Sequence, residues 1–258
     1  MSSNPIFDIA GKTALVTGSS RGIGQELARG LAASGVNVIL HGRDAAALEQ
    51  TADQFEKDHG RRPGVVRFDV TDAAAVAENL DALVAEHGAP DILVNNAGTQ
   101  SRAPFHEFEP ANFDRVIATN LSAAFYVAQQ VSAAMVTRGT GGKIINIGSA
   151  MTVLARQTIA PYSASKAAVA MLSKGMAADL ARYDIQVNTL SPGYFETEMN
   201  AALVADETFN DWLINRTPAR RWGAVKDLVG TLLFLASPAS DFVSGQNIVV
   251  DGGLTSVV

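Results

Sequence analysis

Short apolar runs alternate with longer alanine-rich segments along the whole chain, and this alternation constrains the fold more than any other feature. The runs that predict strands are Thr13–Val16, Asn37–Leu40, Val65–Phe68, Ile92–Asn95, Lys143–Ile147, Gln186–Leu190 and Asn247–Val250. Helical patterns lie near Ile23–Ala33, Ala45–Lys57, Ala73–Glu86, Ala111–Thr137, Pro161–Tyr183 and Val225–Ala236. Most of the apolar runs are continuous, as is typical of strands that helices cover on both faces. The sequence therefore predicts an α/β fold, a doubly wound parallel sheet of the Rossmann type with seven strands.

No linker, repeat or low-complexity segment divides the 258 residues, so we expect one domain over 1–258. The stretch Glu196–Arg221 differs from the rest because it is long, mixed in polarity and placed directly after a predicted strand. Insertions of this kind often form mobile segments over active sites. We therefore expect a substrate lid around 196–221.

The composition excludes several classes of function. The formal charge is 20 − 26 = −6, which gives no basic surface for nucleic acid or an anionic membrane. The chain has no cysteine, so disulfides and zinc–thiolate sites are excluded, and its four histidines are scattered without the spacing of metal ligands. The N-terminus lacks the pattern of a signal peptide, and no apolar run approaches the roughly 20 residues that span a bilayer. We expect a soluble cytoplasmic protein without a metal.

A glycine-rich loop connects the first predicted strand to the first predicted helix. It reads Thr17-Gly-Ser-Ser-Arg-Gly-Ile-Gly24, a looser spacing than G-x-G-x-x-G. In this context the bare backbone lets a pyrophosphate approach, and the N–H groups at the helix start receive its charge. The expected dinucleotide contacts in the loop are Gly18, Ser20, Arg21, Gly22, Ile23 and Gly24.

The end of the second strand distinguishes NAD from NADP. A site for NAD usually carries Asp or Glu there, whereas this chain has Leu40-His-Gly-Arg43. Arg43 and Arg21 can bind a 2′-phosphate through charge-assisted hydrogen bonds, although both can also be solvated surface charges. Asp44 precedes a helical pattern and fits an N-cap better than a ribose contact. The predicted cofactor is NADP(H).

Tyr162 and Lys166 lie four positions apart, and Ser149 lies thirteen positions before the tyrosine. Residues four apart are neighbours on a helix surface, so the lysine cation is expected to lower the pKa of the phenol, which is otherwise about 10. The serine hydroxyl can hold the reacting oxygen while the tyrosine moves its proton. These three residues are candidate catalytic residues, and the family resemblance described next adds Asn120 to them.

With these motifs in order, the chain resembles the short-chain dehydrogenase/reductase family over essentially its whole length. The motifs that carry the likeness are Thr17–Gly24, Asp69, Asn95-Asn-Ala-Gly98, Asn120, Ser149, Tyr162 with Lys166, and Pro192-Gly193. The resemblance implies that Asp69 and Val70 contact the adenine and that Asn96, Ala97 and Gly98 line the path of the cofactor. It also implies that Lys166 and Tyr162 contact the nicotinamide end, as do Pro192, Gly193, Phe195 and Thr197. Asn120 resembles the asparagine that holds a water near the lysine in a proton relay.

Substrate choice rests on Arg102, which follows the Asn-Asn-Ala-Gly motif, and on Arg156, which lies between Ser149 and Tyr162. Both are candidates for binding a carboxylate together with Ser149 and Tyr162, or else they pair with acidic side chains or face water. Pro161–Lys166, Pro192–Met199, Arg216–Gly223 and Ala239–Val243 resemble the gluconate 5-dehydrogenases. That subfamily usually has Asn in place of His41, and the likeness implies NADP-linked interconversion of D-gluconate and 5-keto-D-gluconate.

Three alternatives stay open. A 3-oxoacyl carrier-protein reductase is similar throughout the core, and a reductase of another sugar, a steroid or a small ketone is possible. A binding protein that senses NADP without catalysis is the alternative of another class, although the presence of all four candidate catalytic residues argues against it. The resemblance further implies a homotetramer, and we expect the apolar C-terminus Leu254–Val258 to pack against a neighbouring subunit.

Overall fold

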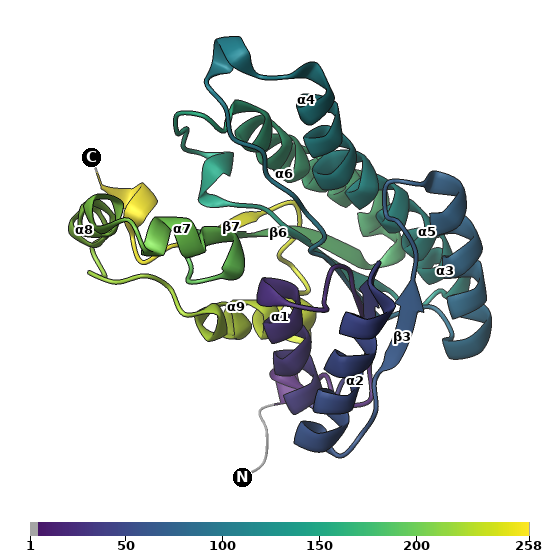
Figure 1. The fold of residues 1–258 in the computed structure, drawn as a ribbon. Coiled ribbons are helices and arrows are strands. Elements are labelled where there is room, and N and C mark those ends of the chain that lie inside the picture. The colour runs from purple at the N-terminus through teal and green to yellow at the C-terminus, as the bar shows by residue number, and fades with distance from the viewer. Residues whose placement is uncertain (1–4, 258) are drawn as a thin grey trace.

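The computed structural model describes residues 5–257, without the side chain of Met199, and contains one seven-stranded parallel sheet (Figure 1). The strands are β1 (Thr13–Val16), β2 (Asn37–Gly42), β3 (Gly64–Arg67), β4 (Ile92–Asn95), β5 (Gly142–Ile147), β6 (Ile185–Pro192) and β7 (Asn247–Val250). Their order across the sheet is β3-β2-β1-β4-β5-β6-β7. The predicted fold class and all seven predicted strands are confirmed. β2, β5 and β6 are each longer by one to three residues, and β3 is shifted by one residue toward the N-terminus.

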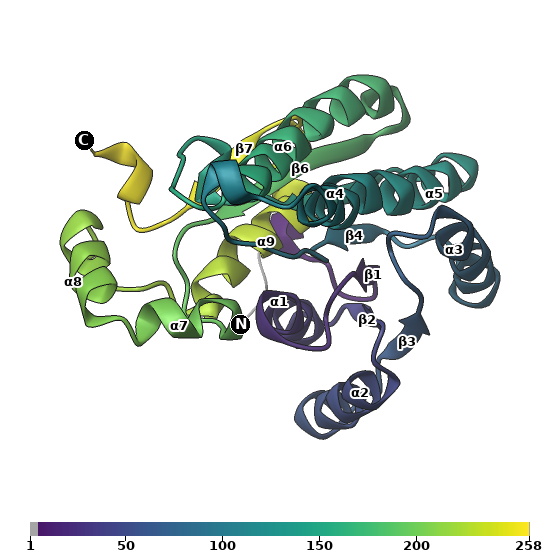
Figure 2. The same cartoon turned by 45° about the horizontal axis from the view of Figure 1, so that its top comes forward.

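Helices cover both faces of the sheet, as Figure 2 shows. The helices are α1 (Gly22–Ala33), α2 (Ala45–His59), α3 (Ala73–His87), α4 (Pro110–Ile117), α5 (Ala123–Arg138), α6 (Ala160–Leu180), α7 (Ala201–Val204), α8 (Glu207–Arg216) and α9 (Val229–Ala236). On one face α1, α2 and α9 pack against the strands, and on the other α3, α5 and α6 do so. None of the described helices combines the length and the apolar character that crossing a bilayer requires.

The strand residues explain why both faces need helices. Ala14 and Val16 of β1 belong to the core under α1 and α9, whereas Leu15 belongs to the core under α3 and α5. Successive side chains of a strand point to opposite faces, so a continuously apolar strand is buried only if both faces are covered.

Local signals set several helix boundaries. The Asp44 carboxylate accepts the Ala47 N–H at 3.1 Å at the start of α2, which confirms its predicted role as an N-cap. Asp72 caps α3 in the same way, and Gly60 ends α2 with a φ of 70°.

The helix predicted over Ala111–Thr137 is interrupted, which the sequence pattern did not indicate. A π-helical turn at Ala118–Ser122 separates α4 from α5 and contains the buried Asn120. The side chain of Asn120 bonds the backbone N–H and C=O of Thr99, at 2.7 and 3.0 Å. Such turns insert one residue into a helix and often mark functional sites, and here the turn directs an amide into the interior.

The stretch 196–221, which we call the lid segment, contains α7 and α8 and projects to one side of the sheet (Figure 1). It has a small core of its own, in which Leu203 and Leu213 pack with Trp222 and Leu254. Leu254 is therefore buried within its own chain, and the expected packing of this residue against a neighbouring subunit is wrong. Val258, the last residue of that prediction, lies outside the described residues.

Candidate active site

The carboxyl ends of β1 and β4 mark the point where the chain changes direction across the sheet. The connections from β1 lead to β2 on one side, and β4 lies on the other side of β1. In parallel sheets of this kind, ligands bind in the crevice outside the strand ends at such a switch point. The predicted glycine loop and the Asn-Asn-Ala-Gly motif follow β1 and β4, so both lie at this crevice.

The glycine loop depends on close contacts with the Asn-Asn-Ala-Gly motif. Gly18 has a φ of +63°, and a Cβ there would lie 3.0 Å from the Ala97 Cα. A Cβ on Gly24 would overlap the Asn96 amide and the Gly18 carbonyl. The Asn96 side chain donates to the carbonyls of Thr17 and Gly18, at 2.9 and 3.0 Å. Asn96 therefore supports the loop from behind, and Gly18 and Gly24 are required by packing and backbone conformation.

The start of α1 is available to an anion. Its N-cap residue, Arg21, makes no side-chain hydrogen bond to the first turn. Gly22 has a φ of +60°, and a Cβ at this position would meet no atom of the described chain within 4 Å. Free N–H groups and a helix dipole at a bare backbone are what a pyrophosphate requires, so this loop fits the predicted dinucleotide.

Arg21 lies in the glycine loop and Arg43 directly after β2, and each contacts one carboxylate. Arg43 lies 3.4 Å from Asp69, and Arg21 lies 3.2 Å from Glu198 of the lid segment. The hydrogen bond from the Thr71 N–H, with a smaller contribution from Arg43, holds the pKa of Asp69 below its usual value. Both arginine side chains are largely exposed, and exposed ion pairs contribute little free energy. Either guanidinium can therefore exchange its carboxylate for a phosphate at low cost.

His41 holds the glycine loop from the second strand, a role that the sequence pattern did not reveal. The Gly18 N–H donates to Nδ1 of His41 at 3.2 Å, and Nε2 lies 3.1 Å from the Phe68 carbonyl. The ring is 2% exposed and lies 4.2 Å from the ring of Phe68. Since the Gly18 contact needs an acceptor and the Phe68 contact a donor, the imidazole is neutral with its proton on Nε2. Burial lowers the pKa of His41 from 6.5 to about 4.

This burial makes stability depend on pH. The unfolded chain takes up a proton on His41 below its ordinary pKa of 6.5, and the folded chain does so only near pH 4. The stabilisation is therefore present above pH 6.5 and is lost as the pH falls toward 4. We expect the free energy of unfolding to fall by roughly 2 kcal/mol more between pH 7 and pH 5 in the wild type than in His41→Asn. Urea denaturation at both pH values measures this difference, and equal pH slopes in the two proteins would contradict it.

The Ser149, Tyr162 and Lys166 side chains converge where β5 ends beside α6. Ser149 follows β5 and hydrogen-bonds the phenol of Tyr162. Lys166 is 5% exposed, and its Nζ donates to the Ile147 carbonyl at 2.7 Å. Nζ lies 5.9 Å from the centre of the Tyr162 ring. The structure thus brings the three residues together, as the sequence predicts.

The ionisation of these groups differs from the simple expectation. Burial raises the pKa of Tyr162 above its usual value, and the hydrogen bond from Ser149 only partly opposes this. Burial also lowers the pKa of Lys166 to about 8. The predicted lowering of the phenol pKa by Lys166 is not found in this structure, because the lysine is directed to the Ile147 carbonyl and burial is the largest influence on the pKa of Tyr162. Tyr162 is therefore protonated at neutral pH.

Asn120 lies beside this group, within the π-helical turn. Its amide nitrogen donates to Ser165 at 2.9 Å as well as to Thr99. A Cβ built on Gly98 would lie 3.4 Å from Asn120 Oδ1 and 3.7 Å from Lys166 Nζ. Gly98 therefore keeps a small space open where the asparagine and the lysine approach one another. A water bound there remains a prediction.

Arg102 and Arg156 are neighbours, although they lie more than fifty residues apart in sequence. The Ala103 N–H donates to the Thr158 carbonyl at 3.1 Å and joins the two loops. Partial burial, and secondly the positive charge of Arg156, lower the pKa of Arg102. Among the ion pairs of the described residues, neither guanidinium has a carboxylate partner. Two unpaired cations close together form a site for an anion.

Tyr194 connects the arginines to the candidate catalytic tyrosine, and the sequence analysis did not select it. Its hydroxyl lies 3.5 Å from the Arg156 guanidinium, and the side chain also lies within electrostatic range of Arg102 and Tyr162. The available signal was its position directly after the Pro192-Gly193 motif. Only the arrangement in space relates it to Arg102 and Arg156.

The remaining predicted contacts lie around the same crevice. Val70 is buried in the core, Ile23 packs against the core, and Ser20 accepts a hydrogen bond from Thr51 through its carbonyl. Pro192 ends β6, and a Cβ on Gly193 would overlap Asp251. Phe195 is 3% exposed and belongs to the core, and Thr197 lies in the lid segment just before the short 3-10 helix Glu198–Asn200. Phe195 therefore has only its backbone available to a cofactor.

Comparisons with known proteins agree over the whole chain. A family model described as enoyl-(acyl carrier protein) reductase matches residues 18–255. A gluconate 5-dehydrogenase of Gluconobacter oxydans (strain 621H) is 51% identical over 255 residues, which cover 99% of each chain. The chain belongs to the short-chain dehydrogenase/reductase family.

Two further members of this family are similar to the chain. A 5-keto-D-gluconate 5-reductase of Escherichia coli (strain K12) is 46% identical over 99% of this chain and 100% of its own. A gluconate 5-dehydrogenase from Burkholderia cenocepacia J2315 is 53% identical in sequence, and its crystal structure is of a complex with NADP and tartrate. It superposes with a TM-score of 0.95 over 98% of this chain and 99% of that chain. The predicted family membership is confirmed, and the chain is an oxidoreductase of this family.

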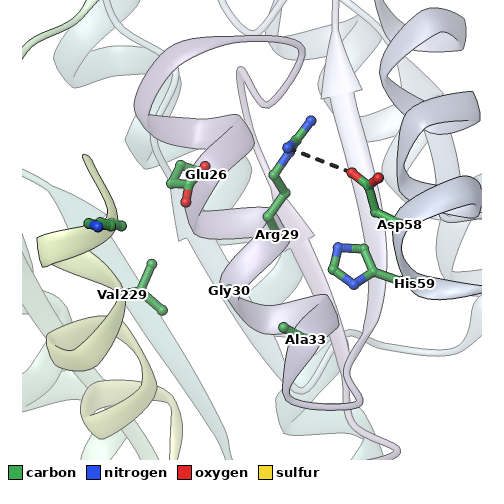
Figure 3. Close-up of a pocket in the computed structure, with 8 residues that line it drawn as sticks. Glu26, Arg29, Gly30, Ala33, Asp58, His59 and Val229 are labelled. Atoms are coloured by element: carbon green, nitrogen blue, oxygen red, sulfur yellow. Dashed lines mark ion pairs between the residues drawn. The ribbon is translucent and has the colours of Figure 1, made fainter. Parts of the chain in front are cut away.

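A hollow of about 370 Å³ lies away from the candidate catalytic residues, between α1, α2 and the start of α9 (Figure 3). Acidic and basic side chains both line it, and Arg29 pairs with Asp58 across it at 3.7 Å. None of the predicted site residues lines this hollow. Its mixed charge gives no preference for one class of ligand.

Proposed function

We propose that this chain is an NADP(H)-dependent oxidoreductase that interconverts D-gluconate and 5-keto-D-gluconate. The observation that carries the proposal is the pair Arg102 and Arg156, two adjacent guanidinium groups that share Tyr194 with the Ser149–Tyr162 pair. A sugar acid has a carboxylate for the arginines and a carbon-bound oxygen for the tyrosine. The names of the similar proteins, and the tartrate bound by one of them, support the same class of substrate.

The cofactor part of the proposal rests on the fit of the glycine loop. The open backbone at Gly22 and the uncapped start of α1 suit a pyrophosphate, and Arg43 and Arg21 suit a 2′-phosphate. The presence of NADP in a similar gluconate 5-dehydrogenase supports this choice. The bound nicotinamide supplies or accepts the hydride.

In this proposal the protein moves and places the proton. Ser149 holds the substrate oxygen beside the Tyr162 hydroxyl, and Tyr162 gives its proton to that oxygen as the ketone is reduced. Its raised pKa keeps the phenol protonated and ready for this direction. Lys166 orients the ribose of the cofactor, and with Asn120 it returns a proton to Tyr162. Oxidation of the alcohol reverses these steps.

A second candidate, a reductase of acyl carrier-protein thioesters, is favoured by the description of the matching family model. The two candidates differ in what the cleft must bind. A carrier-bound thioester has no carboxylate near its reacting ketone, so two unpaired arginines would be left there without a partner. This difference favours the sugar acid.

A substrate panel tests the proposal. We expect rapid NADPH oxidation with 5-keto-D-gluconate and slow oxidation with a 3-oxoacyl thioester or an uncharged ketone. In Arg102→Gln we expect kcat/KM for 5-keto-D-gluconate to fall by about 30-fold, since a charge-assisted contact is worth roughly 1.5–3 kcal/mol. Arg182→Gln is the matched control, because Arg182 is an exposed arginine just after α6 and contacts the ring of Tyr183. Turnover of the thioester alone would overturn the sugar-acid assignment.

We further propose a cytoplasmic homotetramer in which α5 and α6 form contacts between subunits. Phe125 and Met171 on these helices are 44% and 65% exposed, which supports a partner surface there. The family resemblance is the other support for the tetramer.

We also propose that the lid segment moves over the cleft, because its small core is separate from the two cores of the sheet.

A further inference from the structure

Phe209 and Trp212 of the lid segment, and Trp222 directly after it, gather around Tyr194, and one of these rings also contacts Arg156. The Tyr194 ring lies 5.4 Å from Phe209, 6.5 Å from Trp212 and 5.9 Å from Trp222, with each pair nearly edge to face. Phe209 additionally presents its face to Arg156, with the guanidinium carbon 5.1 Å from the ring centre. No such contact with Trp212 or Trp222 is present among the described residues.

Arg156 needs this support because of its neighbour. Its charge lies close enough to Arg102 to lower the pKa of that residue, so the two guanidinium groups repel each other. No acidic side chain of the described residues forms an ion pair that offsets the repulsion. An aromatic face attracts a cation without neutralising it, so the full charge stays available to a ligand. The Tyr194 hydroxyl, 3.5 Å from Nη1, limits the direction of the same guanidinium.

The contact also joins two separate parts of the site. Arg156 belongs to the loop before α6, whereas Phe209 belongs to α8 of the lid segment. Trp222, whose Nε1 donates to Asn210 at 2.8 Å, fixes the neighbouring turn of α8. The position of α8 therefore determines where the ring of Phe209 lies against the arginine.

We infer that Phe209 and Tyr194 are positioning residues that hold Arg156 for the carboxylate of the substrate, so that the lid segment selects keto acids over uncharged ketones. This inference rests on the proposed function, because it takes the ligand of Arg156 to be a substrate carboxylate. Neither side chain takes part in proton transfer. Their loss is expected to change the binding of acids and to leave the chemical step intact.

The test compares an acid with its uncharged derivative. KM and kcat are measured for 5-keto-D-gluconate and for its methyl ester in the wild type, Phe209→Leu, Tyr194→Phe and Trp212→Leu. We expect Phe209→Leu to raise KM for the acid about fivefold, with kcat and the KM for the ester unchanged. Tyr194→Phe keeps the ring and removes the hydroxyl, and we expect a smaller increase for the acid alone. Trp212→Leu removes a half-exposed ring that lies 5.3 Å from Phe209 but does not contact Arg156. Tyr194 and Trp222 still hold Phe209 in this variant, so it is expected to behave as the wild type.

Equal changes for acid and ester in Phe209→Leu, or equal effects of Phe209→Leu and Trp212→Leu, would overturn the inference. Calorimetric titration of the NADP-loaded proteins with tartrate decides it without turnover. We expect the Kd for tartrate to rise about fivefold in Phe209→Leu and not in Trp212→Leu. If the wild type binds tartrate but reduces no keto acid, the proposed function is refuted. The tartrate Kd values of the two variants then still decide whether Phe209 positions Arg156 for a carboxylate. A Kd that is unchanged in Phe209→Leu, or a wild type that does not bind tartrate, would overturn the inference itself.

Discussion

Tyr162→Phe is expected to lower kcat for reduction of 5-keto-D-gluconate by about a thousandfold. The variant removes the hydroxyl that gives the proton and keeps the ring, and a positioned acid typically contributes 10²–10⁴-fold to the rate. The Tyr162 hydroxyl hydrogen-bonds Ser149, so the variant also removes one hydrogen bond of this serine. Ser149 keeps another, because its hydroxyl still accepts the Met151 N–H at 3.1 Å. NADPH consumption measured at saturating substrate gives kcat directly.

Tyr183→Phe is the control for this variant. Tyr183 lies just after α6 and is 38% exposed. Its replacement by Phe also removes one phenol hydroxyl, but away from the site. We expect it to retain full activity. The proposed proton transfer would be refuted if Tyr162→Phe bound NADPH normally and kept more than about a tenth of the wild-type kcat.

Arg43→Gln is expected to lower kcat/KM for NADPH by about 50-fold and to leave kcat/KM for NADH nearly unchanged. The side chain contacts only an exposed carboxylate, so its removal breaks a weak ion pair and the proposed bonds to a 2′-phosphate. A charge-assisted bond of roughly 2.3 kcal/mol, within the usual range of about 1.5–3 kcal/mol, accounts for a change of this size. The measurement is the ratio of kcat/KM for the two cofactors.

The matched control is Arg62→Gln. Arg62 is also exposed and pairs with three carboxylates, Glu49, Asp53 and Glu56, on the outer side of α2. We expect its cofactor ratio to equal that of the wild type. A wild type that prefers NADH, or an Arg43→Gln variant that loses both cofactors equally, would show that Arg43 does not read the 2′-phosphate.

The strands and the order of the motifs could be predicted because they follow from local physics. Continuously apolar runs such as Ile92–Asn95 are buried on both faces, and the glycines before α1 are dictated by a backbone with positive φ and close contacts. The spacing of Tyr162 and Lys166 directly fixes their common helix face. Each of these features depends on residues that are near one another in sequence.

Features that depend on long-range contacts were not predictable. The break in the helix at Asn120 arises from bonds to Thr99 and Ser165, and an alanine-rich sequence does not display it. His41 is important because Gly18 and Phe68 both bond its ring. The pKa of Tyr162 follows from burial, which a sequence spacing cannot reveal. Tyr194 joins the site only because its hydroxyl reaches Arg156 across the fold.

Identification of the reaction product tests whether the protein reduces 5-keto-D-gluconate to D-gluconate with NADPH. Wild-type protein is incubated with 5-keto-D-gluconate and a limiting amount of NADPH, and the products are identified by NMR spectroscopy. We expect D-gluconate to form in an amount equal to the NADPH consumed. Absence of NADPH consumption by the folded protein, or formation of the C5 epimer in place of D-gluconate, would contradict the proposed reaction.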